Sequence, residues 1–178
     1  RIARHALRMP GLKDKRERAS AGRRLQNERM SFTKLTYHII FSTRSRVMSI
    51  DNDHERELYK YIWDYCKARN VFVHRLGGMP DHIHALVDIP PVLSLSGFIQ
   101  NLKAETSKFM RINPHFPHWN GWSEGYGAFT KSFADIPITI NYINNQKRHH
   151  LTKTFKEEYL EELAAAGFNM EAYDFNEI

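Results

Sequence analysis

The chain has 178 residues, 42% of them hydrophobic, and a formal net charge of +6. This composition excludes an intrinsically disordered chain and suits one domain with a buried core and tails. The chain has no run of about 18 apolar residues, and its single cysteine, Cys66, excludes an internal disulfide framework. We therefore expect a cytoplasmic protein without a membrane span or a signal peptide.

The positive charge is concentrated at the N-terminus. Residues 1–30 contain ten Arg or Lys and three acidic residues, a net charge of +7, which leaves −1 for the rest of the chain. This segment has no apolar period, so we expect a disordered or vector-derived basic extension, followed by one domain over 31–178. Met30 directly precedes a strand pattern and is the expected natural start. The alternative is a basic arm that follows phosphates.

The first part of the domain predicts a strand followed by a helix. Residues 33–43 are largely β-branched or aromatic and alternate in part, as in a strand. Asp51 or Asp53 is expected to cap a helix that runs to about Asn70. The apolar stripe of this helix comprises Leu58, Ile62, Tyr65 and Cys66.

The middle of the domain predicts two strands and a long helix. The strands cover 71–76 and 82–89, and the turn between them contains Gly77, Gly78 and Pro80. Ser94 is expected to cap a helix that ends near Ile112. One side of this helix carries Leu95, Ile99, Leu102, Thr106 and Phe109.

The C-terminal part predicts a strand and two helices after a loop over about 113–125. These elements cover 126–133, 136–148 and 155–165. Asp135 is expected to cap the first of these helices, and Gly167 is expected to end the last one.

The predicted order is β-α-β-β-α-β followed by two helices, which is typical of a ferredoxin-like α+β fold. In this fold two helices cover one face of an antiparallel sheet. We expect the other face to stay free for a ligand, nucleic acid or a partner. Because a fold alone does not determine function, the functional argument depends on the site residues.

Two histidines lie on one predicted strand. Residues two apart on a strand point to the same side, so His82 and His84 are expected to face one way and Ile83 the other. Neutral imidazole is a common metal ligand. Taken alone, a His-x-His pair among ten histidines is more often a chance pair than a metal site.

A tyrosine and a glutamine share a face of the predicted helix over 136–148. Tyr142 and Gln146 are four residues apart, although such a pair taken alone is usually structural or solvated. With His82 and His84, the Gln146 amide oxygen completes a three-ligand site that suits Mg²⁺ or Mn²⁺ and leaves positions open for phosphate and water. Tyr142 is then placed as a nucleophile toward that phosphate.

These residues resemble a known family. The segment Gly78–Leu86 resembles the HUH motif (His, hydrophobic residue, His) of single-tyrosine transposases of the insertion sequence 200/605 family. The segment Tyr142–Gln146, followed by His149 and His150, resembles the YxxxQ motif of their tyrosine helix. Further stretches of the family's character are Tyr37–Thr43 with Arg46, Trp122–Phe129 and Phe155–Tyr159.

The resemblance implies a bacterial or archaeal enzyme that is a homodimer with a ferredoxin-like core. Such an enzyme recognises DNA hairpins at the ends of a mobile element and cleaves single-stranded DNA. Cleavage leaves a 5′-phosphotyrosine, here on Tyr142, and a free 3′-OH, and it needs Mg²⁺ or Mn²⁺ held by His82, His84 and Gln146. The resemblance leaves open whether the tyrosine helix serves its own subunit or the partner.

Other residues are weaker candidates. Basic or imidazole side chains that could contact DNA phosphates are Arg46, Lys103, Lys108, Arg111 and His149, with a solvated surface as the alternative. His149 and His150 are expected at a solvated helix end, His38 is expected to be a core histidine, and Asp81 is expected to face away from His82 in a turn. Trp119, Trp122 and Tyr126 could stack on unpaired bases or pack in the core or a dimer.

Two non-catalytic alternatives stay open. The same element order occurs in RNA-recognition modules, and Gly125-Tyr126-Gly127 resembles part of their aromatic strand motif. However, Glu124 and Ala128 stand where that motif has a basic and an aromatic residue. The other alternative is a metal-bound structural or regulatory domain.

Overall fold

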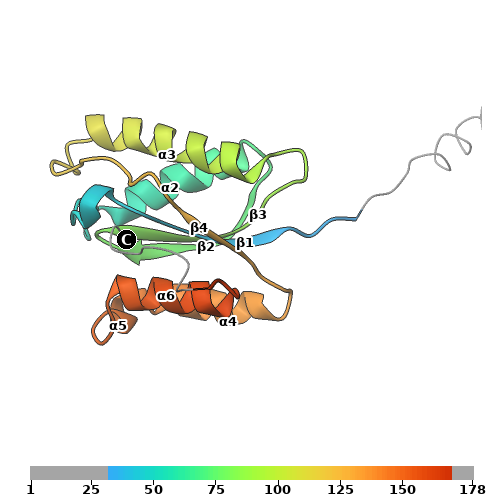
Figure 1. Cartoon of the computed structure of the whole chain (residues 1–178). Helices are drawn as coiled ribbons and strands as arrows, with labels where there is room; N and C mark the ends of the chain where they lie inside the picture. The colour runs from blue at the N-terminus through green and yellow to red at the C-terminus, as the bar shows by residue number, and fades with distance from the viewer. Residues whose placement is uncertain (1–31, 170–178) are drawn as a thin grey trace, which may run out of the picture. The chain divides into compact units, whose positions relative to one another are not determined.

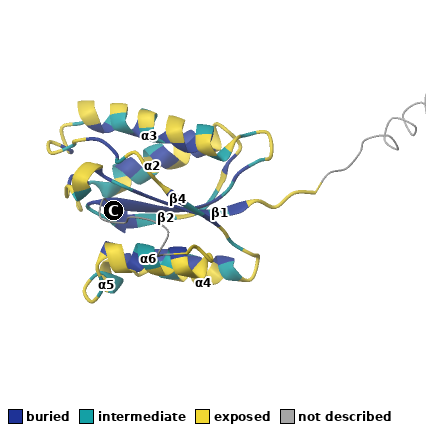
Figure 2. Cartoon of the chain, in the orientation of Figure 1, coloured by how far each residue is buried: buried dark blue, intermediate teal, exposed yellow. Residues whose placement is uncertain are grey.

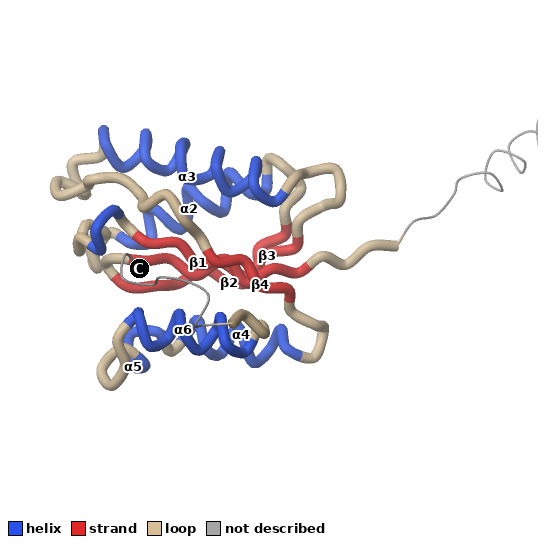
Figure 3. Tube along the Cα trace, viewed as in Figure 1, coloured by secondary structure: helices blue, strands red, loops and turns tan. Residues whose placement is uncertain are grey.

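The computed structural model describes residues 32–169, so the predicted basic extension over 1–30 lies outside the described residues. The described residues contain a four-stranded antiparallel sheet with the strand order β2-β3-β1-β4. Its strands are β1 (Thr36–Ser42), β2 (Phe72–Met79), β3 (His82–Asp88) and β4 (Gly127–Thr130). This order and the intervening helices confirm the predicted ferredoxin-like α+β fold (Figures 1 and 3).

The first face of the sheet is covered by α2 (Glu55–Lys67) and α3 (Leu95–Ile112) (Figure 1). Alternate strand residues such as Ile39, Ile83 and Val87 are buried in the cluster that includes the apolar stripes of both helices. The predicted stripe of α2 is confirmed, because Leu58, Ile62, Tyr65 and Cys66 are all buried. Burial raises the pKa of the Cys66 thiol to about 12, so this cysteine is an unreactive core residue.

The second face of the sheet is also covered, contrary to the expectation that it stays free. The helices α4 (Asp135–Asn144) and α6 (Phe155–Ala165) lie on it, with the short α5 (Gln146–His149) between them in the chain (Figure 1). The physical reason is that this face is also apolar. Ile40 packs with Phe155 of α6, and Leu86 packs with Ile143 of α4, so a free face would expose these side chains.

The burial pattern follows this three-layer arrangement, because the strands are largely buried between exposed outer faces of the helices (Figure 2). No helix among residues 32–169 is long and apolar enough to span a membrane.

The turn predicted at Gly77 and Gly78 is wrong, because both glycines belong to β2. A Cβ on Gly77 would lie 2.7 Å from the Ile143 Cγ2 and 3.0 Å from its carbonyl oxygen. A Cβ on Gly78 would lie 2.1 Å from the His82 carbonyl oxygen. These glycines therefore permit α4 and β3 to approach β2 closely, and close approach of another backbone is a known reason for glycine inside a strand.

The single helix predicted over 136–148 is divided in two. Asn145 separates α4 from α5 and has φ −99° and ψ 11°. Its side-chain Nδ2 donates to the Asn141 carbonyl oxygen at 2.8 Å, a local bond of the kind by which Asn competes with helical geometry. Tyr142 and Gln146 consequently lie on two short helices.

Helix caps differ from the prediction at two of three sites. Ser94 caps α3 as predicted, because its side chain accepts a hydrogen bond from the Gly97 N–H. Asp51 instead accepts bonds from a turn before α2, and Asp135 is the first residue of α4, where it accepts bonds from Ser132. The predicted strands at 33–43 and 126–133 are shorter in the structure, at Thr36–Ser42 and Gly127–Thr130.

Candidate metal and tyrosine site

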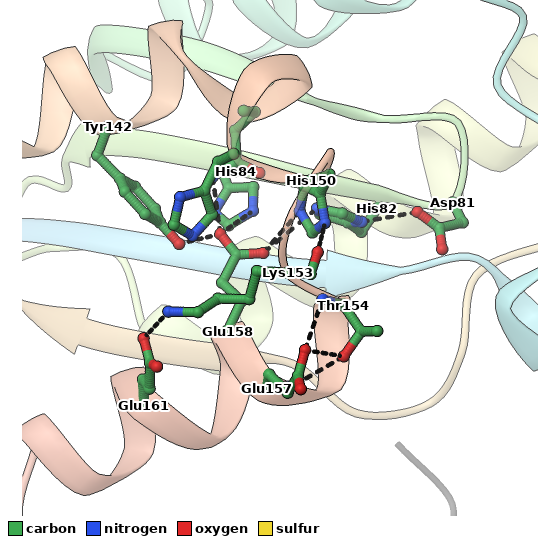
Figure 4. Close-up of polar contacts among 12 residues, drawn as sticks. Asp81, His82, His84, Tyr142, His150, Lys153, Thr154, Glu157, Glu158 and Glu161 are labelled. Atoms are coloured by element: carbon green, nitrogen blue, oxygen red, sulfur yellow. Dashed lines mark hydrogen bonds and ion pairs between the residues drawn. The ribbon is translucent and has the colours of Figure 1, made fainter.

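Four predicted residues meet between the sheet and the C-terminal helices, and Figure 4 labels three of them, His82, His84 and Tyr142. His82 and His84 extend from β3 toward α4 and α6, and both are fully buried. The His84 and Tyr142 ring centroids lie 5.8 Å apart. Gln146 at the start of α5 is also buried. The strand therefore places both imidazoles on one side, and the helices bring the phenol and the amide to that same side.

Asp81 orients His82, so the expectation that Asp81 faces away is wrong. The Asp81 Oδ1 lies 2.7 Å from the His82 Nδ1. The Arg46 guanidinium in turn lies 2.5 Å from the Asp81 Oδ2 and stacks 3.5 Å above the Phe155 ring. Because a carboxylate accepts the proton of Nδ1, the lone pair of His82 is left on Nε2, inside the cluster.

His38 supports His84 in a similar way. The His38 Nε2 and the His84 Nδ1 are 3.0 Å apart, and the His38 Nδ1 lies 3.7 Å from the Glu162 Oε2. A proton on the His38 Nδ1 that faces this carboxylate makes its Nε2 an acceptor for the His84 Nδ1–H. The expected core histidine is therefore buried, as predicted, and it also directs the His84 Nε2 lone pair into the cluster.

Both strand histidines are neutral in this environment. Burial lowers the pKa of His82, although the hydrogen bond to Asp81 acts in the opposite direction. Burial and the nearby His38 hold the pKa of His84 well below its usual value. A neutral imidazole with a free lone pair is the form that binds a metal ion.

The three predicted ligand atoms are among the buried polar atoms of the cluster that have no hydrogen-bond partner. They are the His82 Nε2, the His84 Nε2 and the Gln146 Oε1. Buried polar atoms in proteins are normally paired, so three acceptors left without a donor at one place need a physical explanation. The donor set of two imidazole nitrogens and one amide oxygen fits a divalent cation, and these are the residues that the sequence predicts as ligands.

A carboxylate that the sequence prediction missed lies at the centre of the cluster. Glu158 of α6 accepts a hydrogen bond from the Tyr142 hydroxyl, and its Oε1 accepts another from the Gln146 Nε2 at 2.7 Å. Its Oε2 lies 2.8 Å from the His150 Nε2 (Figure 4). Glu158 therefore contacts the tyrosine, the glutamine and a histidine at once.

The pattern of α6 holds a signal for this residue. Phe155, Glu158, Leu163 and the half-buried Tyr159 lie on the covered side of the helix. An acidic residue on the apolar side of a helix is rarely buried without a partner. Thr154 and Glu157 form a capping box that fixes where α6 begins, and thereby where Glu158 points.

The metal-free protein is expected to lose stability as the pH rises. Burial, followed by the charge of Glu162, raises the Glu158 pKa from 4.5 to about 8. The Glu158 pKa is higher in the folded than in the unfolded protein. The contribution of this carboxyl to stability is therefore fully present below pH 4.5 and is lost as the pH rises through about 8. In the presence of a chelator, we expect the free energy of unfolding of wild type to fall relative to that of Glu158→Gln. The expected slope between pH 4.5 and about 8 is up to about 1.4 kcal/mol per pH unit.

Thermal unfolding of both proteins between pH 5 and pH 9 measures this difference. The comparison with Glu158→Gln removes the effect of the buried histidines, which titrate in both proteins. Parallel pH profiles of the two melting temperatures would show that the carboxyl does not have the raised pKa.

The remaining predicted residues are divided between two regions. Arg46 and His149 lie beside the site, where Arg46 pairs with Asp81 and the His149 ring lies 5.4 Å from the Tyr142 ring. The lysines and arginine of α3 lie in the helical layer on the opposite face of the sheet (Figure 1). Lys103 donates to the carbonyl oxygens of 123–125, and Lys108 pairs with Glu105.

Two expectations about aromatic and imidazole residues are resolved by burial. His150 is not a solvated helix end, because its side chain is 7% exposed and faces Glu158. Trp122 is a core residue whose Nε1 donates to the Thr106 Oγ1 at 2.9 Å, and Trp119 stacks on it edge to face. Tyr126 stays partly exposed.

A surface cavity of about 660 Å³ reaches Tyr142 from solvent. Its wall is formed by parts of β4, α4 and α6, and it includes Lys131, Thr139 and Glu162. The tyrosine is thus accessible from the side of the cavity, while the histidines behind it are buried.

Comparison with known proteins places this site in a family context. Residues 31–146 match the family model described as transposase IS200 like. The transposase of insertion sequence element IS200 from Salmonella typhimurium is 29% identical over 117 residues, which cover 62% of this chain and 75% of that protein.

Solved structures show the same fold. A candidate transposase from Deinococcus radiodurans R1 matches with a TM-score of 0.51 and 25% identity, over 67% of this chain and 96% of the other. A REP-associated tyrosine transposase bound to a REP hairpin matches with a TM-score of 0.53 and 15% identity, over 85% of this chain and 95% of the other.

Proposed function

The chain belongs to the IS200-like transposase family, and we propose that it cuts and rejoins single-stranded DNA with Tyr142 as the nucleophile. In this proposal His82, His84 and Gln146 hold Mg²⁺ or Mn²⁺. One observation carries it: the Tyr142 phenol lies beside a buried cluster in which the His82 Nε2, the His84 Nε2 and the Gln146 Oε1 all lack partners.

The proposed reaction conserves the phosphodiester bond. The Tyr142 oxygen attacks phosphorus and forms a phosphotyrosine bond, while the bond from phosphorus to the 3′ oxygen breaks. The phenolic proton leaves along the hydrogen bond to Glu158, and the departing 3′ oxygen takes up a proton. Attack by the 3′-OH of another strand reverses the step and joins the DNA. Bound at these residues, the cation supplies Lewis-acid polarisation of the phosphate.

The geometry assigns distinct tasks to the residues around this step. The hydrogen bond to Glu158 holds the Tyr142 hydroxyl at the cluster, which reduces the motion that the reaction must restrict. Asp81 and His38 fix the ring orientation of the two histidines. The cavity beside Tyr142 gives a strand access to the phenol without exposing the histidines.

The proposed substrate is single-stranded DNA that carries a hairpin at an element end. A protein of the same fold is described as bound to a REP hairpin, and the family resemblance implies hairpin recognition. The proposed enzyme is a homodimer, as the same resemblance implies. Tyr142 lies beside His84 of its own chain, so each subunit contains the tyrosine and the three ligands.

An RNA-recognition-like module is less consistent with the structure. Such modules stack bases on an open sheet face. Here α2 and α3 cover one face and α4 and α6 cover the other (Figure 1). Binding of this kind would also leave the three unpartnered acceptor atoms without a role.

Covalent capture tests the proposed function. The protein is incubated with labelled single-stranded DNA that contains the hairpin and flank of its own element, with Mn²⁺ or with chelator, and is then denatured. We expect a labelled protein band only with Mn²⁺, and a tryptic peptide that carries a nucleotide on Tyr142 in mass spectrometry. Binding of the DNA without an adduct in any divalent metal would refute the catalytic proposal.

A further inference from the structure

Glu158 enters the cluster from α6, which lies outside the residues 31–146 that the family model matches. It is 2% exposed, and its Oε2 has no hydrogen-bond partner. Among residues 32–169, the side chains within ion-pair distance of Glu158 are three histidines, His82, His84 and His150. No lysine or arginine of this part of the chain lies within that distance. The carboxylate is thus buried without a compensating cation from the protein.

The tautomer of His150 makes the burial of the Glu158 carboxylate more unfavourable. The His150 Nδ1 lies 3.0 Å from the Lys153 carbonyl oxygen, which can only accept, so Nδ1 carries the proton. In the neutral ring the lone pair is therefore on Nε2. That lone pair lies 2.8 Å from the Glu158 Oε2.

His82 presents a lone pair to the same oxygen. Its Nδ1 faces Asp81, which leaves Nε2 as the acceptor, and this Nε2 lies 3.8 Å from the Glu158 Oε2. When the Glu158 carboxyl is ionised, two nitrogen lone pairs and one carboxylate oxygen therefore converge without a proton among them. Acceptors that converge in a buried place repel one another unless a cation lies between them.

We infer that Glu158 is itself a ligand of the metal centre, so that α6 contributes a carboxylate to the site formed by His82, His84 and Gln146. The inference rests on the proposed function, because it concerns the same cation. It adds a negatively charged oxygen ligand to three neutral ligands, and carboxylate oxygen is a preferred ligand of both Mg²⁺ and Mn²⁺.

The spacing of the atoms agrees with this assignment. Two ligands of one octahedral ion, each at roughly 2.1 Å, lie about 3 to 4.2 Å apart. The His84 Nε2 lies 3.6 Å from the Glu158 Oε1, and the His82 Nε2 lies 3.8 Å from the Glu158 Oε2. The ligand atoms of His82, His150 and Glu158 all lie within 4.8 Å of one another. No large movement of α6 is required for the carboxylate to share an ion with the histidines.

The assignment has a consequence for the C-terminal part of the domain. Because Glu158 is held in place by the packing of α6 on the sheet, a cation bound to Glu158 and the strand histidines connects α6 to β3. Metal binding is then coupled to the docking of α6, and the ion retains one positive charge for the phosphate after one carboxylate charge is compensated.

The test is Mn²⁺ binding to the full chain, measured by the electron paramagnetic resonance signal of free Mn²⁺ and by calorimetry. Glu158→Gln keeps the size of the side chain and removes its charge, and we expect it to weaken Mn²⁺ binding at least about 10-fold. Glu161→Gln is the matched control on α6, because Glu161 is exposed and pairs with Lys153 away from the cluster (Figure 4). We expect wild-type affinity for this control.

The outcomes separate the inference from the proposed function. If His84→Ala abolishes Mn²⁺ binding while Glu158→Gln binds as tightly as wild type, Glu158 is not a ligand and only this inference fails. If wild type itself binds neither Mn²⁺ nor Mg²⁺, the proposed metal centre fails. Thermal unfolding in chelator confirms that each variant is folded, and a folded Glu158→Gln protein is expected because the substitution removes a buried charge.

Discussion

Replacement of His84 by alanine is expected to abolish metal-dependent strand cleavage, with a loss of about 10³-fold or more. The His84 Nε2 is one of the three proposed ligand atoms that are buried without a hydrogen-bond partner, and the His84 Nδ1 faces His38. The imidazole is therefore held in one orientation with its lone pair on the ligand side. Cleavage of a labelled hairpin substrate in Mn²⁺ measures the loss, and Mn²⁺ binding is expected to disappear with it.

His74→Ala is the matched control for this experiment. His74 is also a partly buried strand histidine bonded to a carboxylate, because its Nε2 lies 2.9 Å from the Asp88 Oδ1, but it belongs to β2 and not to the cluster. We expect this variant to cleave at a rate close to that of wild type. If both variants lose cleavage equally while Mn²⁺ binding survives in both, the effect comes from strand stability and not from a ligand at His84.

Most of the fold was predictable because local pattern and tertiary packing agree. The alternation in β1 and the apolar stripe of α2 reflect the same buried cluster. The predictions failed where a tertiary contact decides the local structure. Gly77 and Gly78 have the local character of a turn, and only the approach of Ile143 and of the His82 carbonyl explains why they lie in a strand.

The expectation of a free second sheet face also failed because tertiary packing decides which faces are covered. Pattern analysis of single elements shows that β1 carries Ile40 on one side and Ile39 on the other, but it does not say how many helices are available to cover each side. The C-terminal helices were predicted as elements, and their position on the sheet follows only from the combined apolar surface of Ile40, Leu86 and Phe129.

The four principal site residues were identifiable because each lies in a short motif of fixed spacing. His82 and His84 are two apart on a strand, and Tyr142 and Gln146 are four apart. Asp81 directly precedes His82 and Glu158 lies in the stretch Phe155–Tyr159, but neither position shows from the sequence alone that its side chain reaches the cluster. Glu158 reaches the cluster through the packing of α6, and Asp81 contacts the His82 Nδ1 from the turn before β3, so both contacts depend on the three-dimensional structure.

Replacement of Tyr142 by phenylalanine is expected to reduce strand cleavage by at least about 10⁴-fold and to leave no covalent adduct. The substitution removes only the oxygen that would attack phosphorus, while the ring keeps its contacts with His38 and His84. Because the hydroxyl is not among the proposed metal ligands, Mn²⁺ affinity is expected to stay within about threefold of wild type. Rapid-quench cleavage assays and calorimetry on the same preparation measure the two quantities.

This pattern distinguishes a nucleophile from a residue that supports the metal. A loss of both cleavage and Mn²⁺ binding in Tyr142→Phe would show that the phenol acts through Glu158, whose carboxylate it contacts, and not on phosphorus. Tyr126→Phe is the control, because Tyr126 is partly exposed and lines a different cavity from Tyr142. If cleavage in Tyr142→Phe stays within about 10-fold of wild type, water or another side chain attacks the phosphate, and strand rejoining through a tyrosine linkage is excluded.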